Sequence, residues 1–220
     1  FTIQNNAVHL TSFNSLNQRT IELEKVLLEW KSKRLFRCLD GWRNERYFIY
    51  GPNGPLLEIE RAATGLFGVL SLGCQLNGYT IVNNEIKMWI GKRSLSKQTY
   101  PGMLDNTVGG GLTAGSIPLQ TLIKECYEEA GIEEHLASKS KYVGYISYWQ
   151  EKEFESNSGI DYIFDLQLPE SFIPKPVDLE VDSFQLVSMT DLKELILQNK
   201  FHPEALMVVV DFLIRHHAIS

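Results

Sequence analysis

The sequence predicts an α+β protein, in which a mixed sheet with helices on both faces follows a small N-terminal α+β unit. Three observations support this fold class. From residue 65 onward, segments rich in strand formers come first, then one helix, then further strands and two final helices. A glycine-rich stretch directly precedes the middle helix. A turn cluster of Gly and Pro lies within the first quarter of the chain and belongs to the smaller unit.

The smaller unit is expected over residues 1–64. Leu23, Leu27 and Trp30 recur at helical spacing, and Asn14 or Ser15 is suited to cap the helix that they predict. The elements expected in this unit are a helix at about 16–36 and strands at 42–50 and 56–60, with a turn at 51–55.

The larger unit is expected over residues 65–220 and holds the sheet. Its strands are expected at 69–76, 85–93, 142–149, 162–168 and 183–188, with a turn at Asn83-Asn84. Its helices are expected at about 117–130, 191–199 and 203–217, and Gly131 is expected to end the first of them.

The composition excludes several classes of function. Of the 220 residues 44% are hydrophobic, enough for a full core, and the formal net charge of −6 disfavours nonspecific binding to nucleic acid or to an anionic membrane. No apolar run reaches the roughly 18 residues of a membrane-spanning helix. Three scattered cysteines without a CxxC pair indicate a reducing compartment. We therefore expect a cytoplasmic protein that acts on a small molecule, and its oligomeric state stays open.

The helix at about 117–130 carries three glutamates. Glu125, Glu128 and Glu129 stand at i, i+3 and i+4, so we expect their carboxylates on one face, opposite an apolar stripe. A solvated acidic face is the common meaning of such a run. The glycine-rich stretch 109–115 before the helix favours a ligand site instead, because glycine lets the backbone approach a ligand closely. Hard oxygen ligands at this density suit Mg²⁺ or Mn²⁺.

Residues 110–132 resemble the Nudix box, Gx5Ex7REUxEExGU, in which U is a bulky apolar residue. The glycine, the spacing and the closing ExxEExGU match. Ser116 stands where the box has its first Glu, and Lys124 stands where it has Arg. In the family those two positions pair with each other and are not the main metal ligands. Ser116 is expected to cap the helix instead, and Lys124 keeps the positive charge.

The similarity extends over nearly the whole chain, to a Nudix subfamily associated with thiamine diphosphate, some members of which are fused to a thiamine pyrophosphokinase. The segments that carry it are 41–45, 59–68 and 93–110. It implies a Nudix-type α/β/α sandwich behind an N-terminal domain. It also implies metal-dependent hydrolysis of thiamine diphosphate, or of its oxo and oxy analogues, to the monophosphate and phosphate. Another nucleoside or sugar diphosphate as substrate, or a catalytically silent binding scaffold, remain alternatives.

The resemblance implies roles for the residues of the box. Glu129 and Glu128 are expected to bind Mg²⁺ or Mn²⁺ together with the carbonyl of Gly110. Glu125 is expected either to hold a further metal ion or to accept a proton from the attacking water. Glu125 and Glu129 are accordingly the expected catalytic residues.

A later loop often supplies one more carboxylate to the metal site in this family. Glu180 lies just before the last expected strand and matches that position. Glu151, Glu153 and Asp161 compete with it, and for each of them a solvated loop acid is the simpler interpretation.

Four residues are candidates for substrate binding. Arg93 and Lys97 flank the passage into the box and are expected to hold the terminal phosphate, with surface ion pairing as the alternative. Trp42 and Arg43 combine an aromatic ring with a cation and are expected to contact a heterocycle. The alternative is that Trp42 packs in the core and that Arg43 pairs with Glu45.

Overall fold

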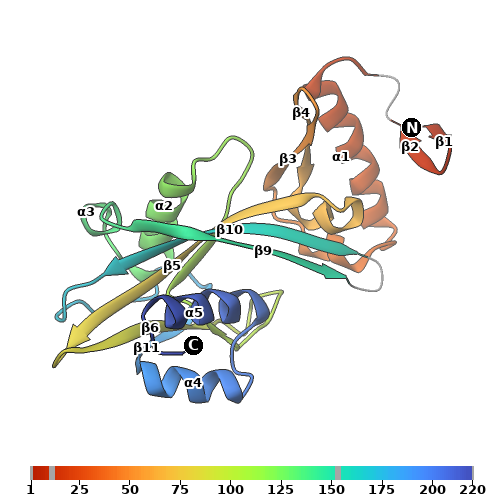
Figure 1. Ribbon diagram of the computed structural model, residues 1–220. Helices are drawn as coiled ribbons and strands as arrows, with labels where there is room; N and C mark the ends of the chain where they lie inside the picture. The colour runs from red at the N-terminus through yellow and green to blue at the C-terminus, as the bar shows by residue number, and fades with distance from the viewer. Residues whose placement is uncertain (1, 10–12, 152–154, 220) are drawn as a thin grey trace. The chain divides into compact units, whose positions relative to one another are not determined.

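The computed structural model describes residues 2–9, 13–151 and 155–219 (Figure 1). Its helices and strands confirm the predicted α+β class. Internal contacts divide the chain into two compact units. The first unit comprises Phe1–Ser71, Thr113–Gly115 and Tyr148–Gly159, and the second comprises Leu72–Leu112, Ser116–Ser147 and Ile160–Ser220.

The first unit contains one long helix, α1 (Leu16–Ser32). The Ser15 hydroxyl accepts a hydrogen bond from the backbone N–H of Gln18 (3.2 Å), so Ser15 is the cap. The helix stops before the expected Phe36, and Arg34 just beyond it adopts a positive φ of 52°. The other elements are β1 (Thr2–Gln4), β2 (Ala7–His9), η1 (Arg37–Gly41), β3 (Arg46–Gly51), β4 (Gly54–Glu60) and η2 (Arg61–Phe67), where η denotes a 3-10 helix.

Helix α1 packs on the antiparallel hairpin β3–β4. Leu23 and Leu27 of the helix share a buried core with Tyr47 of the hairpin. The hydroxyl of Thr20 accepts a hydrogen bond from the backbone N–H of Glu58 (2.9 Å), which fixes the helix against β4.

The strands of the second unit belong to a seven-stranded sheet with the order β11-β6-β5-β10-β9, in which β7 also pairs with β6 and β8 with β5. Strand β5 is antiparallel to β6, whereas β5 and β10 run in the same direction in Figure 1, so the sheet is mixed as predicted. Asn83 and Asn84, both with positive φ, form the expected turn between β5 and β6. The strands are β5 (Leu70–Val82), β6 (Glu85–Arg93), β7 (Leu104–Asp105), β8 (Val108–Gly111), β9 (Lys141–Glu151), β10 (Ser156–Gln167) and β11 (Val181–Ser188).

Helices cover both faces of this sheet, which confirms the predicted sandwich (Figure 1). Leu122 and Cys126 of α2 pack in one core, and Leu192 of α4 and Phe212 of α5 pack in another. Over the described ranges, no helix has the length and apolar composition that crossing a membrane requires. The helices are α2 (Pro118–Ala130), α3 (Glu134–Ala137), α4 (Met189–Leu197) and α5 (Pro203–Arg215).

Both ends of α2 follow from local sequence. The predicted cap by Ser116 is wrong: Pro118 opens the helix, and the extended residue before it, Ile117, takes the cap position without a side-chain hydrogen bond. Gly131 adopts φ +64° after the last turn and ends the helix as predicted. Because β8 ends at Gly111, only a short loop joins it to α2.

Candidate active site

Glu129 is the most buried carboxylate of helix α2. It is 7% exposed, and its Oε2 accepts a hydrogen bond from the backbone N–H of Gly109 in β8 (3.0 Å). Burial raises the pKa of the Glu129 carboxyl well above its usual range. The hydrogen bond from the Gly109 N–H and the charge of Lys97 lower this pKa, whereas the charge of Asp105 raises it further. A cation beside this carboxyl would offset the cost of its burial.

Glu125 lies directly over the glycine strand. A Cβ atom at Gly110 would stand 2.4 Å from Cγ of Glu125, so only glycine allows the side chain to lie there. The carbonyl of Gly110 accepts a long hydrogen bond from the Cys74 thiol (3.6 Å). The structure therefore brings Glu125, Glu129 and Gly110 together at the junction of β8 and α2.

Glu128 is placed differently from its two neighbours. Its carboxylate pairs with Lys124 (2.8 Å), and its side chain is 43% exposed. Glu125, Glu128 and Glu129 follow the i, i+3, i+4 spacing of one helix face, as predicted. Glu129, however, lies at the edge of that face and is buried like Cys126 and Ala130, so it borders the apolar stripe and does not lie opposite it.

The oxygen donors of this region suit a divalent metal ion in their chemistry. Over the described residues, no group of three or more His, Cys, Asp or Glu side chains stands in an arrangement that could hold a metal as it is. The buried Glu129, however, has no cationic side chain at ion-pair distance among the described residues, and Glu125 adds a second negative charge nearby. Two carboxylates and a backbone carbonyl are the donors that Mg²⁺ and Mn²⁺ prefer.

Lys97 and Glu180 form an ion pair with each other. The Lys97 side chain is only 13% exposed and acts electrostatically on Glu129, whereas the Glu180 side chain is 49% exposed. The backbone N–H of Ser94 donates to the carbonyl of Glu180 (2.9 Å), which ties the two segments together. Of the competing acids, Glu151 is exposed, and Glu153 lies outside the described residues.

Arg93 is engaged by neighbours on several sides. Its Nη1 donates to Asp105 (2.7 Å), its Nη2 donates to the carbonyl of Thr99 (2.9 Å), and its side chain is 13% exposed. Asp105 also lies 3.0 Å from Nε2 of His202. Burial would raise the pKa of Asp105, but His202 and Arg93 outweigh it and hold that pKa below its usual value.

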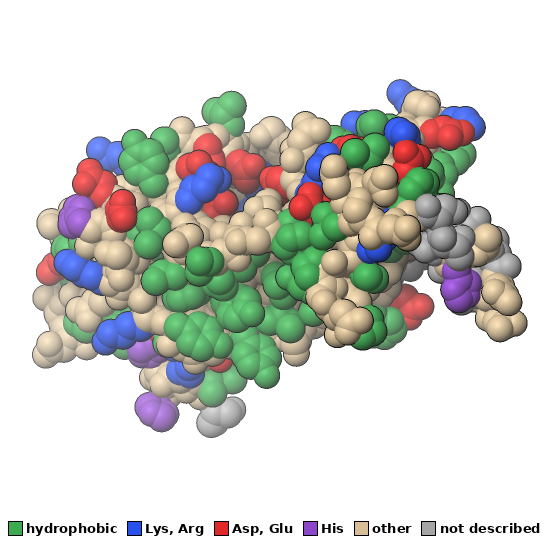
Figure 2. All heavy atoms as spheres, turned by 90° about the horizontal axis from the view of Figure 1, so that it is seen from above, with side chains coloured by type: hydrophobic (Ala, Val, Ile, Leu, Met, Phe, Trp, Pro, Cys, Tyr) green, Lys and Arg blue, Asp and Glu red, His purple; other side chains and the backbone are tan. Residues whose placement is uncertain are grey.

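Charged side chains of both signs are interspersed on the face of the molecule in Figure 2. On this face, a site for an anionic substrate would depend on individual cations rather than on a broad basic surface. Lys97 is a cation of this kind in the second unit, because most of its side chain is shielded from solvent and its charge acts on Glu129.

Trp42 and Arg43 belong to the first unit. Trp42 is half-buried against the core of that unit, its Nε1 donates to Asn44 (2.9 Å), and Lys31 Nζ lies 5.0 Å from its ring centroid. The backbone N–H of Arg43 donates to Glu60 (2.9 Å). Glu45 pairs with Arg61 (2.8 Å).

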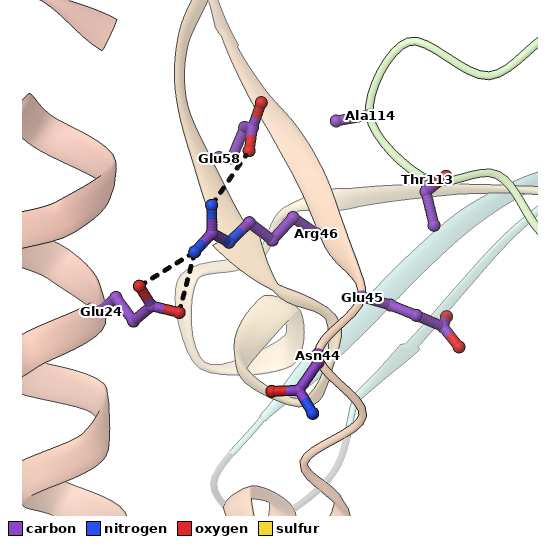
Figure 3. A pocket seen from close by; sticks show the side chains of 7 residues that line it. All are labelled: Glu24, Asn44, Glu45, Arg46, Glu58, Thr113 and Ala114. Atoms are coloured by element: carbon purple, nitrogen blue, oxygen red, sulfur yellow. Dashed lines mark hydrogen bonds and ion pairs between the residues drawn. The ribbon is translucent and has the colours of Figure 1, made fainter. Parts of the chain in front are cut away.

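A polar pocket of about 410 Å³ lies in the first unit (Figure 3). Arg46 reaches across it to both carboxylate oxygens of Glu24 (2.9 and 3.0 Å) and lies 3.6 Å from Glu58. The backbone N–H of Ala114 donates to the carbonyl of Arg46 (2.7 Å). The pocket is lined by Glu24, Asn44, Glu45, Arg46, Glu58, Thr113 and Ala114.

Gln75, a residue of β5, is not among the site residues expected from the sequence. Its Nε2 donates to Asp161 of β10 (3.4 Å), and both side chains are more than nine-tenths buried. The sequence does contain a signal, because Gly73 and Gly109 leave the space that the side chains of Gln75 and Asp161 occupy. Their contact could not be predicted, because the two residues stand 86 positions apart in the sequence.

Comparison with known protein families matches residues 78–208 to the family described as "NUDIX domain" and residues 1–71 to "Domain of unknown function (DUF4743)". Two similar proteins of Arabidopsis thaliana are named "Nudix hydrolase 20, chloroplastic" and "Nudix hydrolase 24, chloroplastic". The first is 41% identical over 181 residues, 81% of this chain and 48% of that protein. The second is 39% identical over 184 residues, which are 82% of this chain and 50% of that protein. The chain spans about half the length of the curated relatives it matches.

Solved structures share the fold at low identity. A MutT protein from Methanosarcina mazei Go1 aligns with a TM-score of 0.51 and 17% identity, over 67% of this chain and 95% of that one. The NUDIX domain of Shewanella oneidensis NrtR, solved in complex with ADP ribose, aligns with a TM-score of 0.50 and 12% identity, over 66% of this chain and 86% of that one. At these identities the likeness concerns the fold alone.

Proposed function

The chain belongs to the Nudix family, and from this premise we propose that it is a metal-dependent hydrolase of the diphosphate bond in a small organic diphosphate. One observation carries the proposal. Glu129 is buried without a cationic partner among the described residues, bonded to the glycine strand and next to Glu125. A buried carboxyl beside a second, partly exposed carboxylate that Lys124 approaches to 3.7 Å is unfavourable for the fold, whereas a bound divalent cation would neutralise both.

Glu125, Glu128, Glu129 and the carbonyl of Gly110 are the proposed metal ligands. When bound, Mg²⁺ or Mn²⁺ supplies Lewis acidity toward the diphosphate oxygens and lowers the pKa of water. Glu128 joins the set when its ion pair with Lys124 opens, which costs little because the pair is exposed. Glu125 orients the attacking water and accepts its proton.

Lys97 is proposed to bind the terminal phosphate. Its ammonium group is largely shielded from solvent, which strengthens its attraction for an anion. Arg93 is proposed to support phosphate binding indirectly. Its hydrogen bonds to Asp105 and Thr99 hold the chain on either side of Lys97 in place. Glu180 holds Lys97 in place through their ion pair, and is the proposed later-loop acid of the metal site.

Thiamine diphosphate, or its oxo and oxy analogues, is the proposed substrate. The support is the similarity of segments 41–45, 59–68 and 93–110 to the thiamine-associated subfamily. Trp42 and Arg43 are proposed to contact the organic part, because a ring and a cation suit a flat heterocycle with polar edges. Products are the monophosphate and inorganic phosphate.

A phosphate-release screen tests this proposal. Thiamine diphosphate, its oxo and oxy analogues, nucleoside diphosphates and diphospho-sugars are each offered with Mg²⁺ or Mn²⁺. Faster release from the thiamine compounds supports the assignment. Faster release from a nucleoside or sugar diphosphate replaces the substrate, and metal-independent or absent release from every compound contradicts the hydrolase proposal.

A further inference from the structure

Gln75 and Asp161 form a buried polar pair beside the glycine strand β8. They lie on the adjacent strands β5 and β10, with Nε2 of Gln75 3.4 Å from Oδ2 of Asp161. Gln75 is 9% exposed and Asp161 is 6% exposed. Oε1 of Gln75 has no hydrogen-bond partner among the described residues.

The pair fills the space that glycines leave open. A Cβ atom at Gly109 would stand 2.3 Å from Oε1 of Gln75, and one at Gly73 would stand 2.2 Å from Oδ1 of Asp161 and 3.3 Å from the carbonyl oxygen of Gly110. Gln75 is the register partner of Gly109, so the two share one face of the sheet. The side chains of the pair therefore lie directly against the backbone of β8.

The opposite face of β8 meets α2. Gly110 pairs with Cys74, on the other face of the sheet, and Glu125 lies over it. The Gly109 N–H is the donor to Glu129. Strand β8 is thus held between Gln75 and Asp161 on one face and the candidate metal-binding carboxylates on the other.

This arrangement is costly for the fold. Burial raises the pKa of Asp161 to about 6, and Glu204 adds to that shift, while Gln75 and His202 oppose it. A buried polar pair with one long hydrogen bond and an unfilled acceptor contributes little stability, and an apolar pair of similar volume would fill the same space at lower cost. Its presence at this position calls for another role.

We propose that Gln75 and Asp161 are positioning residues, which fix the backbone of Gly109 and Gly110 so that the Gly110 carbonyl and Glu129 meet one metal ion. The inference rests on the proposed function, because the metal ion is part of it. It concerns residues outside the box and assigns no contact with substrate to either of them.

The same pair of strands offers a matched control. Asn77 of β5 is fully buried and donates to Asp165 of β10 (3.0 Å), so it forms a second polar pair between these strands. Asn77→Ala removes that pair, whereas Gln75→Ala removes the pair that lies over Gly109. Both changes are expected to lower the melting temperature by similar amounts.

Two readouts separate positioning from stability. Amide hydrogen exchange at Gly109, measured by NMR without metal, is expected to become about tenfold faster in Gln75→Ala and to change less than about twofold in Asn77→Ala. Mn²⁺ affinity, measured by isothermal titration calorimetry, is expected to weaken about tenfold in Gln75→Ala only, as is typical for changes behind a metal site. Asp161→Leu should reproduce both effects, and the isosteric Asp161→Asn should restore near-normal values.

Equal behaviour of the Gln75, Asp161 and Asn77 variants in both readouts would overturn the inference. If Gln75→Ala does not fold, the comparison of Asp161→Leu with Asp161→Asn decides the question. Failure of the unmodified protein to bind Mn²⁺ would contradict the proposed function and the metal-related part of this inference, while exchange at Gly109 would still show whether the pair fixes the strand.

Discussion

Replacement of Gly110 by alanine is expected to reduce kcat about 100-fold by displacing Glu125. The added Cβ would stand 2.4 Å from Cγ of Glu125 and 2.7 Å from its Cδ. Carbon atoms pack at about 3.5 Å or more, so the Glu125 side chain must move by about 1.1 Å. A misplacement of about 1 Å at a reacting group can cost about 10² in rate, or about 2.7 kcal/mol in activation free energy. The loss of stability should be small, since Glu125 has a flexible side chain with some exposure to solvent.

A double-mutant cycle provides the assay for this mechanism. The value of kcat is measured for the unmodified protein, Gly110→Ala, Glu125→Ala and the double variant. If Gly110→Ala acts by displacing Glu125, it lowers kcat only slightly when Glu125 is already replaced by alanine. The effects of the two substitutions on kcat are then strongly non-additive. Gly91→Ala is the matched control, because its Cβ would meet nothing closer than the backbone oxygen of Asn106 at 3.3 Å.

Full activity of Gly110→Ala would show that Glu125 does not need to lie over Gly110 for turnover. Additive losses in the cycle would also refute this mechanism, because they would show that Gly110 acts independently of the Glu125 side chain. A large drop in melting temperature in Gly110→Ala, equal in both backgrounds, would assign the glycine to packing.

Three further predictions concern residues around the site and in the first unit. Asp105→Asn breaks a largely buried ion pair with Arg93 and should lower the free energy of unfolding by about 3 kcal/mol in chemical denaturation. Because the pKa of Asp105 is lowered, its stabilisation is complete above the unfolded-state pKa and disappears as pH falls through the folded-state pKa. The variant should therefore lose less stability in acid than the unmodified protein does. Lys97→Met should raise KM for the diphosphate about tenfold in steady-state kinetics, whereas Lys92→Met, which removes an exposed cation, should leave KM unchanged. Trp42→Ala should raise KM for thiamine diphosphate without affecting a small diphosphate, and equal losses on both substrates with a lower melting temperature would assign Trp42 to the core.

Local sequence was sufficient to predict helix α2 and its surroundings. The apolar spacing, Gly131 and the turn at Asn83-Asn84 all act within a few residues, and the structure has the helix, its end and the turn where these signals place them. The cap was missed because Pro118, rather than a polar side chain, sets the first turn. Local signals compete at helix starts, and a proline at the first helical position outweighs a weak cap.

Long-range contacts could not be predicted in the same way. The burial of Glu129 depends on β8 lying across the end of α2, and the pairing of Lys97 with Glu180 joins segments 83 positions apart. The contact of Gln75 with Asp161 depends on β10 lying beside β5, which no local pattern specifies. Side-chain partners across a sheet follow from strand order and register, and the sequence pattern left both of these open.

The role of Glu129 is tested most directly by the turnover of Glu129→Gln relative to the unmodified protein in the presence of Mn²⁺, with Glu194→Gln on the exposed side of α4 as the control. We expect Glu129→Gln to lower kcat by about 10² or more, Glu194→Gln to have no effect, and excess chelator to abolish turnover of the unmodified protein. Undiminished turnover in Glu129→Gln, or in excess chelator, would contradict the claim that this buried carboxylate and a divalent ion perform the hydrolysis.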